Sequence, residues 1–124
     1  RFRASMGTAP QEFVQAAAEV AWTDDEHVAA RRDVFAQKRA VLLEMCRQRG
    51  LTVHGSRAGL YLWLEVPAGT NDLDYAAACR EAGILVAPGS FFAGSGGGQE
   101  RFVRLALVPT LEECRAAVDV WPGP

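Results

Sequence analysis

Hydrophobic and polar residues recur along this chain with two different periods, which predict both helices and strands. Apolar positions three and four residues apart indicate amphipathic helices. We predict four of them, at about residues 9–22, 24–49, 72–82 and 111–121. Shorter apolar runs bounded by turn residues indicate strands, at 51–54, 60–66, 84–87 and 102–107.

The order of these elements predicts an α+β fold, in which helices cover a small sheet of about four strands. The helix over 24–49 would be roughly 39 Å long, which is longer than a small domain needs. We therefore expect this N-terminal helix to connect two bodies. The predicted organisation is an inter-domain segment with the first helix over 1–23, followed by a domain over 24–124.

Sequence motifs also predict where the helices begin. Thr8–Gln11, Thr23–Glu26 and Thr110–Glu113 each have the spacing of a capping box. Asn71 or Asp72 is the expected cap of the third helix. The predicted inward face of that helix is Leu73, Ala76, Cys79 and Ala82.

One arginine lies inside the apolar run 102–107, and it is the strongest candidate for a binding residue. Successive strand residues point to opposite faces, so Val103 and Leu105 should enter the core while Arg104 faces a cleft or a neighbour. A guanidinium among apolar residues is costly to bury unless it meets an anion, and its planar fork binds carboxylates in bidentate fashion. The residues alone leave open a salt bridge to an internal acid as the alternative.

The glycine-rich segment 94–98 does not predict a phosphate site. It lacks the Gly-Lys-Ser or Gly-Lys-Thr ending of a phosphate loop, and it joins two predicted strands instead of opening a helix. We expect a mobile loop that adjusts around a ligand near Arg104.

The histidines and the lysine predict no reactive centre of their own. His27 and His54 have no partner at metal-ligand spacing, so we expect surface positions and no metal site. Lys38 is the only lysine, and it lies in mid-helix. We expect it to lack the desolvated pocket that a Schiff-base lysine needs.

Composition narrows the functional classes. The formal net charge of −2 over 124 residues gives no basic surface for nucleic acid or for an anionic membrane. No apolar run is long enough for a membrane span. The cysteines fit neither a paired disulfide set nor a zinc motif, so we expect buried free thiols and a cytoplasmic location. They are Cys46, Cys79 and Cys114.

The chain resembles a known enzyme family. Pro-Gly-Ser-Phe-Phe at 88–92 follows an Ile-Leu-Val-Ala strand, and a glycine-rich loop, Phe-Val-Arg-Leu-Ala-Leu and a Thr-capped helix come next. This order is similar to the end of a fold-type I aminotransferase that depends on pyridoxal phosphate (PLP). Thr-Ala-Pro-Gln, Asp-Asp-Glu-His-Val and Ala-Gly-Leu-Tyr-Leu-Trp upstream are similar too. Within the family, the chain most resembles actinobacterial N-succinyldiaminopimelate aminotransferases of lysine biosynthesis.

The resemblance implies a homodimeric PLP enzyme that moves an amino group between glutamate and N-succinyl-2-amino-6-oxopimelate. It implies that Arg104 binds the substrate α-carboxylate, with Tyr61, Ser90 and Phe92 as candidate pocket walls. The family's Schiff-base lysine, its aspartate partner to the pyridine nitrogen and its phosphate-binding residues belong to a large upstream domain. The chain therefore resembles the C-terminal small domain alone, which we expect to be inactive without the rest.

Two functions from other classes fit the same residues. A standalone α+β module would sense a small carboxylate through Arg104 without catalysis. A protein-interaction domain would present its open surfaces to another chain. A large domain with a Schiff-base lysine, encoded in frame upstream, would distinguish the enzyme from both.

Overall fold

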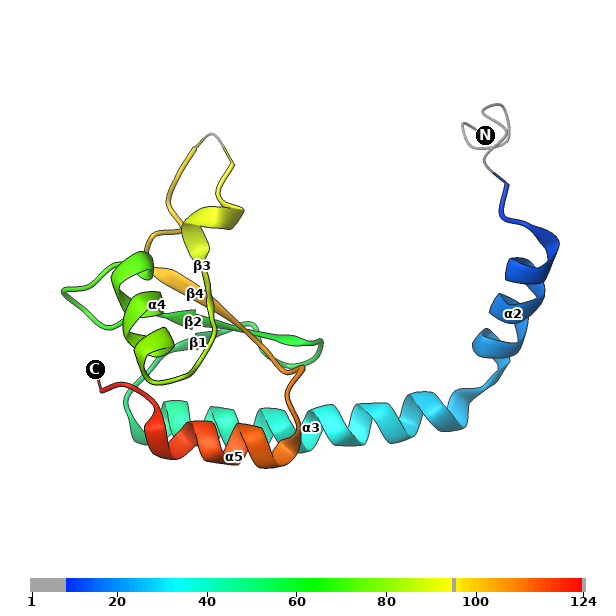
Figure 1. Ribbon diagram of the computed structural model, residues 1–124, viewed down its shortest axis with the longest axis horizontal. Coiled ribbons are helices and arrows are strands. Elements are labelled where there is room, and N and C mark those ends of the chain that lie inside the picture. Colours follow the sequence, from blue (N-terminus) through cyan, green and yellow to red (C-terminus); the bar gives the residue numbers. More distant parts are fainter. Residues whose placement is uncertain (1–8, 95, 124) are drawn as a thin grey trace. The chain divides into compact units, whose positions relative to one another are not determined.

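The structure is a computed structural model that describes residues 9–94 and 96–123 (Figure 1). The chain forms two compact units, Arg1–Arg32 and Asp33–Pro124. The division falls inside helix α3, which spans Asp25–Gln48 and confirms the predicted long helix. The domain boundary expected at residue 24 stays a prediction.

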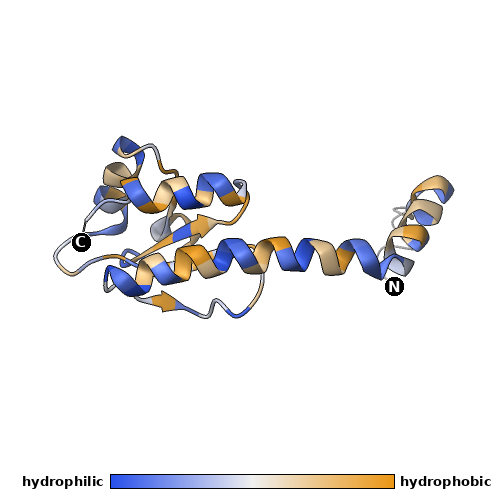
Figure 2. Cartoon of the chain, turned by 90° about the horizontal axis from the view of Figure 1, so that it is seen from below, coloured by the Kyte–Doolittle hydropathy of each residue, from blue (hydrophilic) through white to orange (hydrophobic). Residues whose placement is uncertain are grey.

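The first unit contains helix α2, Glu12–Thr23. Its N-cap residue is Gln11, which makes no side-chain capping bond, so Pro10 precedes the helix instead of lying in its first turn. The predicted cap Thr8 lies outside the described residues. No residue of α2 is buried, and Trp22 is 86% exposed. Figure 2 shows hydrophobic and hydrophilic positions alternating along this helix.

The capping box predicted at Thr23–Glu26 is wrong. Thr23 is the last residue of α2, and its hydroxyl donates to the carbonyls of Glu19 and Val20 in the preceding turn. The side chain of Asp24 takes over the capping role, because its carboxylate accepts the backbone N–H of His27 at 3.1 Å. Asp24 can therefore cap α3, because the Thr23 hydroxyl is already bonded to α2.

The second unit contains a four-stranded antiparallel sheet in the order β1-β2-β4-β3. The central strands confirm the two long strand predictions, whereas the edge strands are shorter than predicted. Residues 84–86 of the strand predicted at 84–87 are not in a strand, whereas Ala87 and Pro88 are. Proline fits an edge strand, where its missing N–H leaves no ladder bond unmade. The strands are β1 Val53–His54, β2 Tyr61–Glu65, β3 Ala87–Pro88 and β4 Phe102–Ala106.

The core lies on one face of this sheet. Side chains at alternate positions of β2 and β4 point into it, with Leu62, Leu64 and Val103 at 0% exposure. Helices α3 and α5, Leu111–Val120, run side by side along the sheet (Figure 1). Arg49 joins them by donating to the carbonyls of Val118 and Trp121. The helices contribute Leu42, Met45, Cys46, Cys114 and the residue after α5, Trp121, to the core.

Helix α4, Asp72–Glu81, begins as predicted but packs a different face. Asn71 caps it by accepting the N–H groups of the second and third helical residues. Asp72, Tyr75 and Cys79 are the buried positions, whereas Leu73 is 54% exposed. The predicted inward face is therefore confirmed at Cys79 but wrong at Leu73, because the helix turns its polar first residue and a tyrosine to the core. Helix α5 confirms its prediction, with the capping box at Thr110–Glu113 formed in both directions.

Candidate carboxylate-binding site

Arg104 lies in the middle of β4, on the face of the sheet opposite the core helices. Its neighbours Val103 and Leu105 are buried, while Arg104 itself is half-buried, which confirms the predicted alternation. In the sheet register Arg104 stands opposite Trp63 of β2 on one side and Ala87 of β3 on the other. A central strand therefore holds the base of this long side chain in place.

Two aromatic rings contact the Arg104 guanidinium. Its central carbon lies 4.4 Å from the centre of the Tyr61 ring and 4.3 Å from that of Phe92. Within 9–94 and 96–123, no carboxylate forms an ion pair with it. The rings hold the cation through their π faces, and the planar fork of N–H donors is the group that a carboxylate needs for a bidentate bond. The internal salt bridge left open by the sequence is thus absent from the described residues.

The second arginine of this region is already paired. Arg101 donates to the carboxylate of Glu65 at 2.5 Å, and His54 lies 3.0 Å from the other oxygen of that carboxylate. The hydrogen bond from His54 and the charge of Arg101 hold the pKa of Glu65 below its ordinary 4.5, against the effect of burial. Arg101 is therefore a poor candidate for binding a substrate carboxylate, and Arg104 is the better candidate.

Phe92 reaches Arg104 from a short 3-10 helix, η1, at Gly89–Phe92. Gly89 sits tightly against neighbouring backbone: a Cβ at this position would lie 2.2 Å from the carbonyl oxygen of Gln99. The N–H of Ser90 donates to the carboxylate of Asp72 at 2.8 Å. Of the three predicted pocket walls, Tyr61 and Phe92 lie on Arg104, whereas Ser90 faces the start of α4.

Sequence reasoning missed the aromatic residues that surround this pair of rings. Trp63 stacks on Phe102 with centroids 5.6 Å apart, and its ring meets that of Phe92 edge-on at 6.0 Å. The alternation of β2 already placed Trp63 on the face of Tyr61. The register of β2 against β4, which brings Trp63 opposite Arg104, is a tertiary feature that no local pattern reveals.

The glycine-rich loop uses its own backbone donors internally. Gly97 and Gly98 adopt positive φ angles, the N–H of Gly97 bonds to the carbonyl of Gly94, and the N–H of Gly98 bonds to the Glu100 carboxylate at 2.9 Å. The Glu100 carboxylate on the Gly98 amide opposes the binding of a phosphate there. The hydrogen bonds of Gly97 and Gly98 therefore argue against a phosphate site at these two amides.

Lys38 departs from its expected surroundings. The side chain is 7% exposed, and its ammonium donates to the carbonyl of Leu107 at 3.3 Å and to that of Val108 at 3.5 Å. The expectation that it lacks a desolvated environment is wrong, because α3 packs this position under the end of β4. The two carbonyls tie the lysine to the core side of the sheet, away from the face that carries Arg104.

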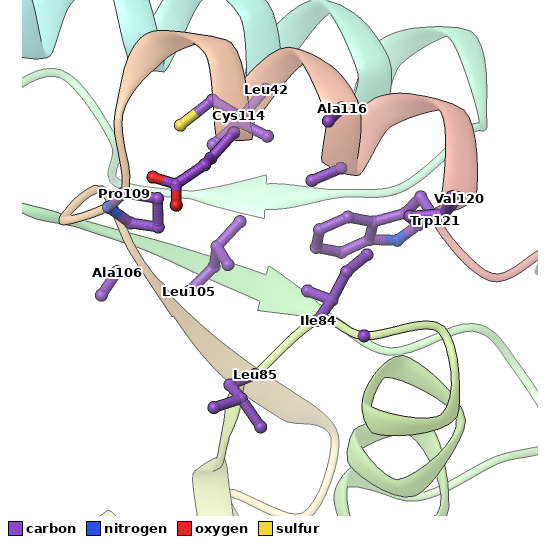
Figure 3. A pocket seen from close by; sticks show the side chains of 13 residues that line it. Leu42, Ile84, Leu85, Leu105, Ala106, Pro109, Cys114, Ala116, Val120 and Trp121 are labelled. Carbon is purple, nitrogen blue, oxygen red and sulfur yellow. The ribbon is translucent and has the colours of Figure 1, made fainter.

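A cavity of about 500 Å³ opens beside α5, but it does not include the arginine site (Figure 3). Its lining is apolar apart from Glu113, whose carboxylate already accepts from Thr110 in the capping box. Figure 3 shows Leu105 of β4 and Trp121, which follows α5, beside this cavity. Judged by its volume, this cavity would be the candidate binding site. A carboxylate, however, needs a cationic partner, and Arg104 provides one.

The histidines and cysteines form no binding or catalytic group among the described residues. His27 and His54 are exposed and pair with Asp24 and Glu65, as the expectation of surface histidines required. The cysteines are free and buried, and burial raises the pKa of the Cys46 and Cys79 thiols to about 11. No described helix is long and apolar enough to cross a membrane.

A protein-family model described as aminotransferase class I and II matches residues 2–120 of the chain. The chain belongs to this family. The fold agrees: an aminotransferase from Neisseria meningitidis Z2491 superimposes with a TM-score of 0.83 at 34% identity, over 96% of this chain and 31% of that one. The α+β class and the recognition of a fold-type I aminotransferase fragment are thereby confirmed.

Two further relatives fit the same family. A probable aminotransferase of Mycobacterium tuberculosis is 47% identical over 85% of this chain and 24% of its own length. The structure of a probable N-succinyldiaminopimelate aminotransferase from Thermus thermophilus matches with a TM-score of 0.70 at 34% identity, over 82% of this chain and 27% of that one. The chain thus spans about a quarter to a third of the length of these aminotransferases.

Proposed function

We propose that this chain is the small domain of a PLP-dependent aminotransferase and that Arg104 binds the carboxylate of the amino-acid and 2-oxo-acid substrates. The observation that supports this role is a guanidinium that contacts the rings of Tyr61 and Phe92 and has no carboxylate partner among the described residues. A bidentate bond to its planar fork would fix the orientation of a bound carboxylate. Arg104 thereby positions the substrate for chemistry done elsewhere.

The residues of this chain do not fit the cofactor. PLP enzymes hold the cofactor through a lysine, and the only lysine here is Lys38, whose ammonium bonds to two carbonyls on the core side. In the glycine-rich loop, the N–H of Gly98 donates to the Glu100 carboxylate and that of Gly97 to the carbonyl of Gly94. We therefore propose that a large domain supplies the cofactor site and that the 124 residues alone do not transaminate.

Kinetics of the polypeptide that joins this chain to its large domain test the role of Arg104. Arg104→Ala removes two charge-assisted hydrogen bonds, so we expect kcat/KM for glutamate and 2-oxoglutarate to fall about 100-fold. Arg104→Lys keeps the charge but loses the planar fork, and about a tenfold loss is expected. Cofactor content, read from the absorbance of bound PLP, should stay unchanged in both variants.

Arg101→Ala is the matched control, because Arg101 carries the same charge three residues away but is paired with Glu65. It should change kcat/KM by less than about twofold. Equal kinetics for the Ala variants of Arg101 and Arg104 would refute the carboxylate-binding role. A loss of PLP on replacing Arg104 would contradict the division of labour between the two domains.

A second measurement tests the division directly on the 124-residue chain. After incubation with PLP and borohydride reduction, mass spectrometry should find no stoichiometric adduct at Lys38, because its ammonium is buried and already bonded. A stoichiometric Lys38 adduct on the folded chain would place cofactor chemistry in this domain and overturn the proposal.

For the substrate, we propose N-succinyl-2-amino-6-oxopimelate with glutamate as the amino donor. Support comes from the resemblance of the sequence and from the similarity to a probable N-succinyldiaminopimelate aminotransferase at 34% identity. Activity of the whole polypeptide with this substrate, compared with succinyl-free diaminopimelate and with aspartate, distinguishes this specificity from related ones. Higher kcat/KM for either competitor would refute it.

We further propose a homodimer in the cytoplasm for the whole polypeptide. Free buried thiols suit a reducing compartment, and the homodimer follows from the family resemblance alone. Sedimentation of the whole polypeptide tests the dimer. The rival function, a carboxylate-sensing module without catalysis, would be favoured if the 124-residue chain bound 2-oxoglutarate in the micromolar range without a large domain.

A further inference from the structure

A buried carboxylate on α4 is connected to Arg104 through the short helix η1. The side chain of Asp72 is 2% exposed, although an acid is rarely buried without partners. Its oxygen Oδ2 accepts the N–H of Ser90 at 2.8 Å. Further along the same short helix, the ring of Phe92 lies 4.3 Å from the guanidinium carbon of Arg104. Asp72 therefore fixes the short helix η1, which carries Phe92, one of the two rings that contact Arg104.

Asp72 also binds the other end of the same loop. Its backbone N–H donates to the carbonyl of Glu100 at 2.8 Å, two residues before β4 begins. The space around Gly89 is closed by the carbonyls of Gln99 and Phe102. The turn thus has little room to move by itself, and Asp72 holds both segments that flank the glycine-rich loop.

We propose that Asp72 is a positioning residue, which holds η1 so that Phe92 lies on Arg104 and keeps the guanidinium fork in one orientation for the substrate carboxylate. This inference rests on the proposed function of Arg104. Asp72 touches no substrate in this scheme. It acts through Phe92 alone, so replacing Asp72 should have no effect beyond that of replacing Phe92.

Asp72→Asn is the variant of choice, because it nearly keeps the volume of the side chain, removes the charge and leaves one neutral carbonyl oxygen as acceptor. Hydrogen bonds to a charged acceptor are about twice as strong as those to a neutral one, so the hold on Ser90 weakens. The matched control is Asp74→Asn. Asp74 lies in the same first helical turn and loses the same charge, but it is exposed and its carboxylate bonds to the side chain of Asn71.

Nuclear magnetic resonance of the 124-residue chain reads the position of Phe92 without any substrate. Ring currents from Tyr61 and Phe92 displace the Arg104 Nε–H resonance, and Asp72→Asn should shift it toward the value found in Phe92→Leu. Asp74→Asn should leave it in place. If Asp72→Asn does not fold, Ser90→Pro removes the N–H donor from the other end of the same connection and should move the resonance in the same direction.

Kinetics of the whole polypeptide then separate positioning from a general structural role. Loss of one cation–π contact is expected to raise KM for 2-oxoglutarate about two- to fivefold, with kcat unchanged. The double variant Asp72→Asn/Phe92→Leu should be no worse than Phe92→Leu alone, because both changes act on the same ring. Additive effects in the double variant would overturn the inference, and so would a KM for Asp72→Asn equal to that of Asp74→Asn.

Failure of this inference is distinguishable from failure of the proposed function. If Arg104→Ala leaves KM unchanged, Arg104 does not bind the carboxylate and both proposals fall. If Arg104→Ala raises KM while Asp72→Asn leaves both KM and the Arg104 resonance unchanged, only the positioning role of Asp72 is wrong.

Discussion

Arg49 and Arg47 stand two residues apart at the end of α3, and the structure predicts very different costs for replacing them. Arg49 donates from one guanidinium nitrogen to the carbonyl of Trp121 at 2.7 Å and from another to that of Val118 at 2.9 Å. These carbonyls lie at the C-terminal end of α5, where no helical partner is available. Arg47 pairs only with the exposed carboxylate of Glu44, at 2.6 Å.

The expected cost of Arg49→Met follows from these contacts. Each charge-assisted bond contributes about 1.5–3 kcal/mol when buried, and half-exposure reduces this to about 1 kcal/mol. Methionine keeps the aliphatic stem, so the packing loss is small. The cation at a helix C-terminus adds a few tenths of a kcal/mol. We expect the free energy of unfolding to fall by about 2 kcal/mol, whereas Arg47→Met should cost less than about 0.5 kcal/mol.

Urea unfolding followed by tryptophan fluorescence measures both variants, since Trp121 is 3% exposed and reports on this part of the core. With an m-value of about 1.5–2 kcal/mol per M, the Arg49→Met midpoint should fall by about 1 M. Midpoints of Arg49→Met and Arg47→Met that agree within error would refute the reasoning. A loss for Arg49→Met that vanishes in high salt would also refute it, because that is the behaviour of a screened surface pair.

Two further predictions concern the loop and the open face of the sheet. Gly89→Ala should lower the free energy of unfolding by at least about 2 kcal/mol in the same urea assay, since the added Cβ would meet backbone oxygens at 2.2 and 2.6 Å. Gly94→Ala is the control, because an added Cβ there meets nothing within 4 Å, and it should be nearly neutral. Equal costs for the two variants would contradict this packing around Gly89. Because His54 and Arg101 lower the pKa of Glu65 in the folded chain, its stabilising contribution is complete above its ordinary 4.5 and disappears as pH falls through the lowered value. Urea midpoints at about pH 6 and about pH 3 should therefore differ less in Glu65→Gln than in the unaltered chain, and an identical difference would exclude the contribution.

Local pattern predicted the elements whose signals are internal to one segment. The alternation over 102–107 identified both the buried residues of β4 and the face of Arg104, because a strand has only two faces. The Thr110–Glu113 capping box formed because its two partners are three residues apart and need nothing from the rest of the fold.

The local predictions that failed involve competition between neighbouring groups. Thr23 was expected to cap α3, but its hydroxyl bonds back to α2 and Asp24 caps instead. Leu73 was expected to be buried, but α4 rotates Tyr75 inward, where its hydroxyl accepts the indole N–H of Trp121 at 2.9 Å. Composition cannot decide such cases, because the partner that settles each one comes from another segment or an adjacent turn.

The period of one strand is enough to put Arg104 on the non-core face, and the printed residues are enough to show that no glycine-rich phosphate motif accompanies it. The surroundings of Arg104 depend on how distant segments pack in three dimensions. The register of β2 against β4 brings Tyr61 to the guanidinium, and the short helix that carries Ser90, bonded to Asp72, brings the ring of Phe92 to it as well. The physical reason is that faces follow from the period of one strand, whereas enclosure requires segments that are distant in sequence to pack together.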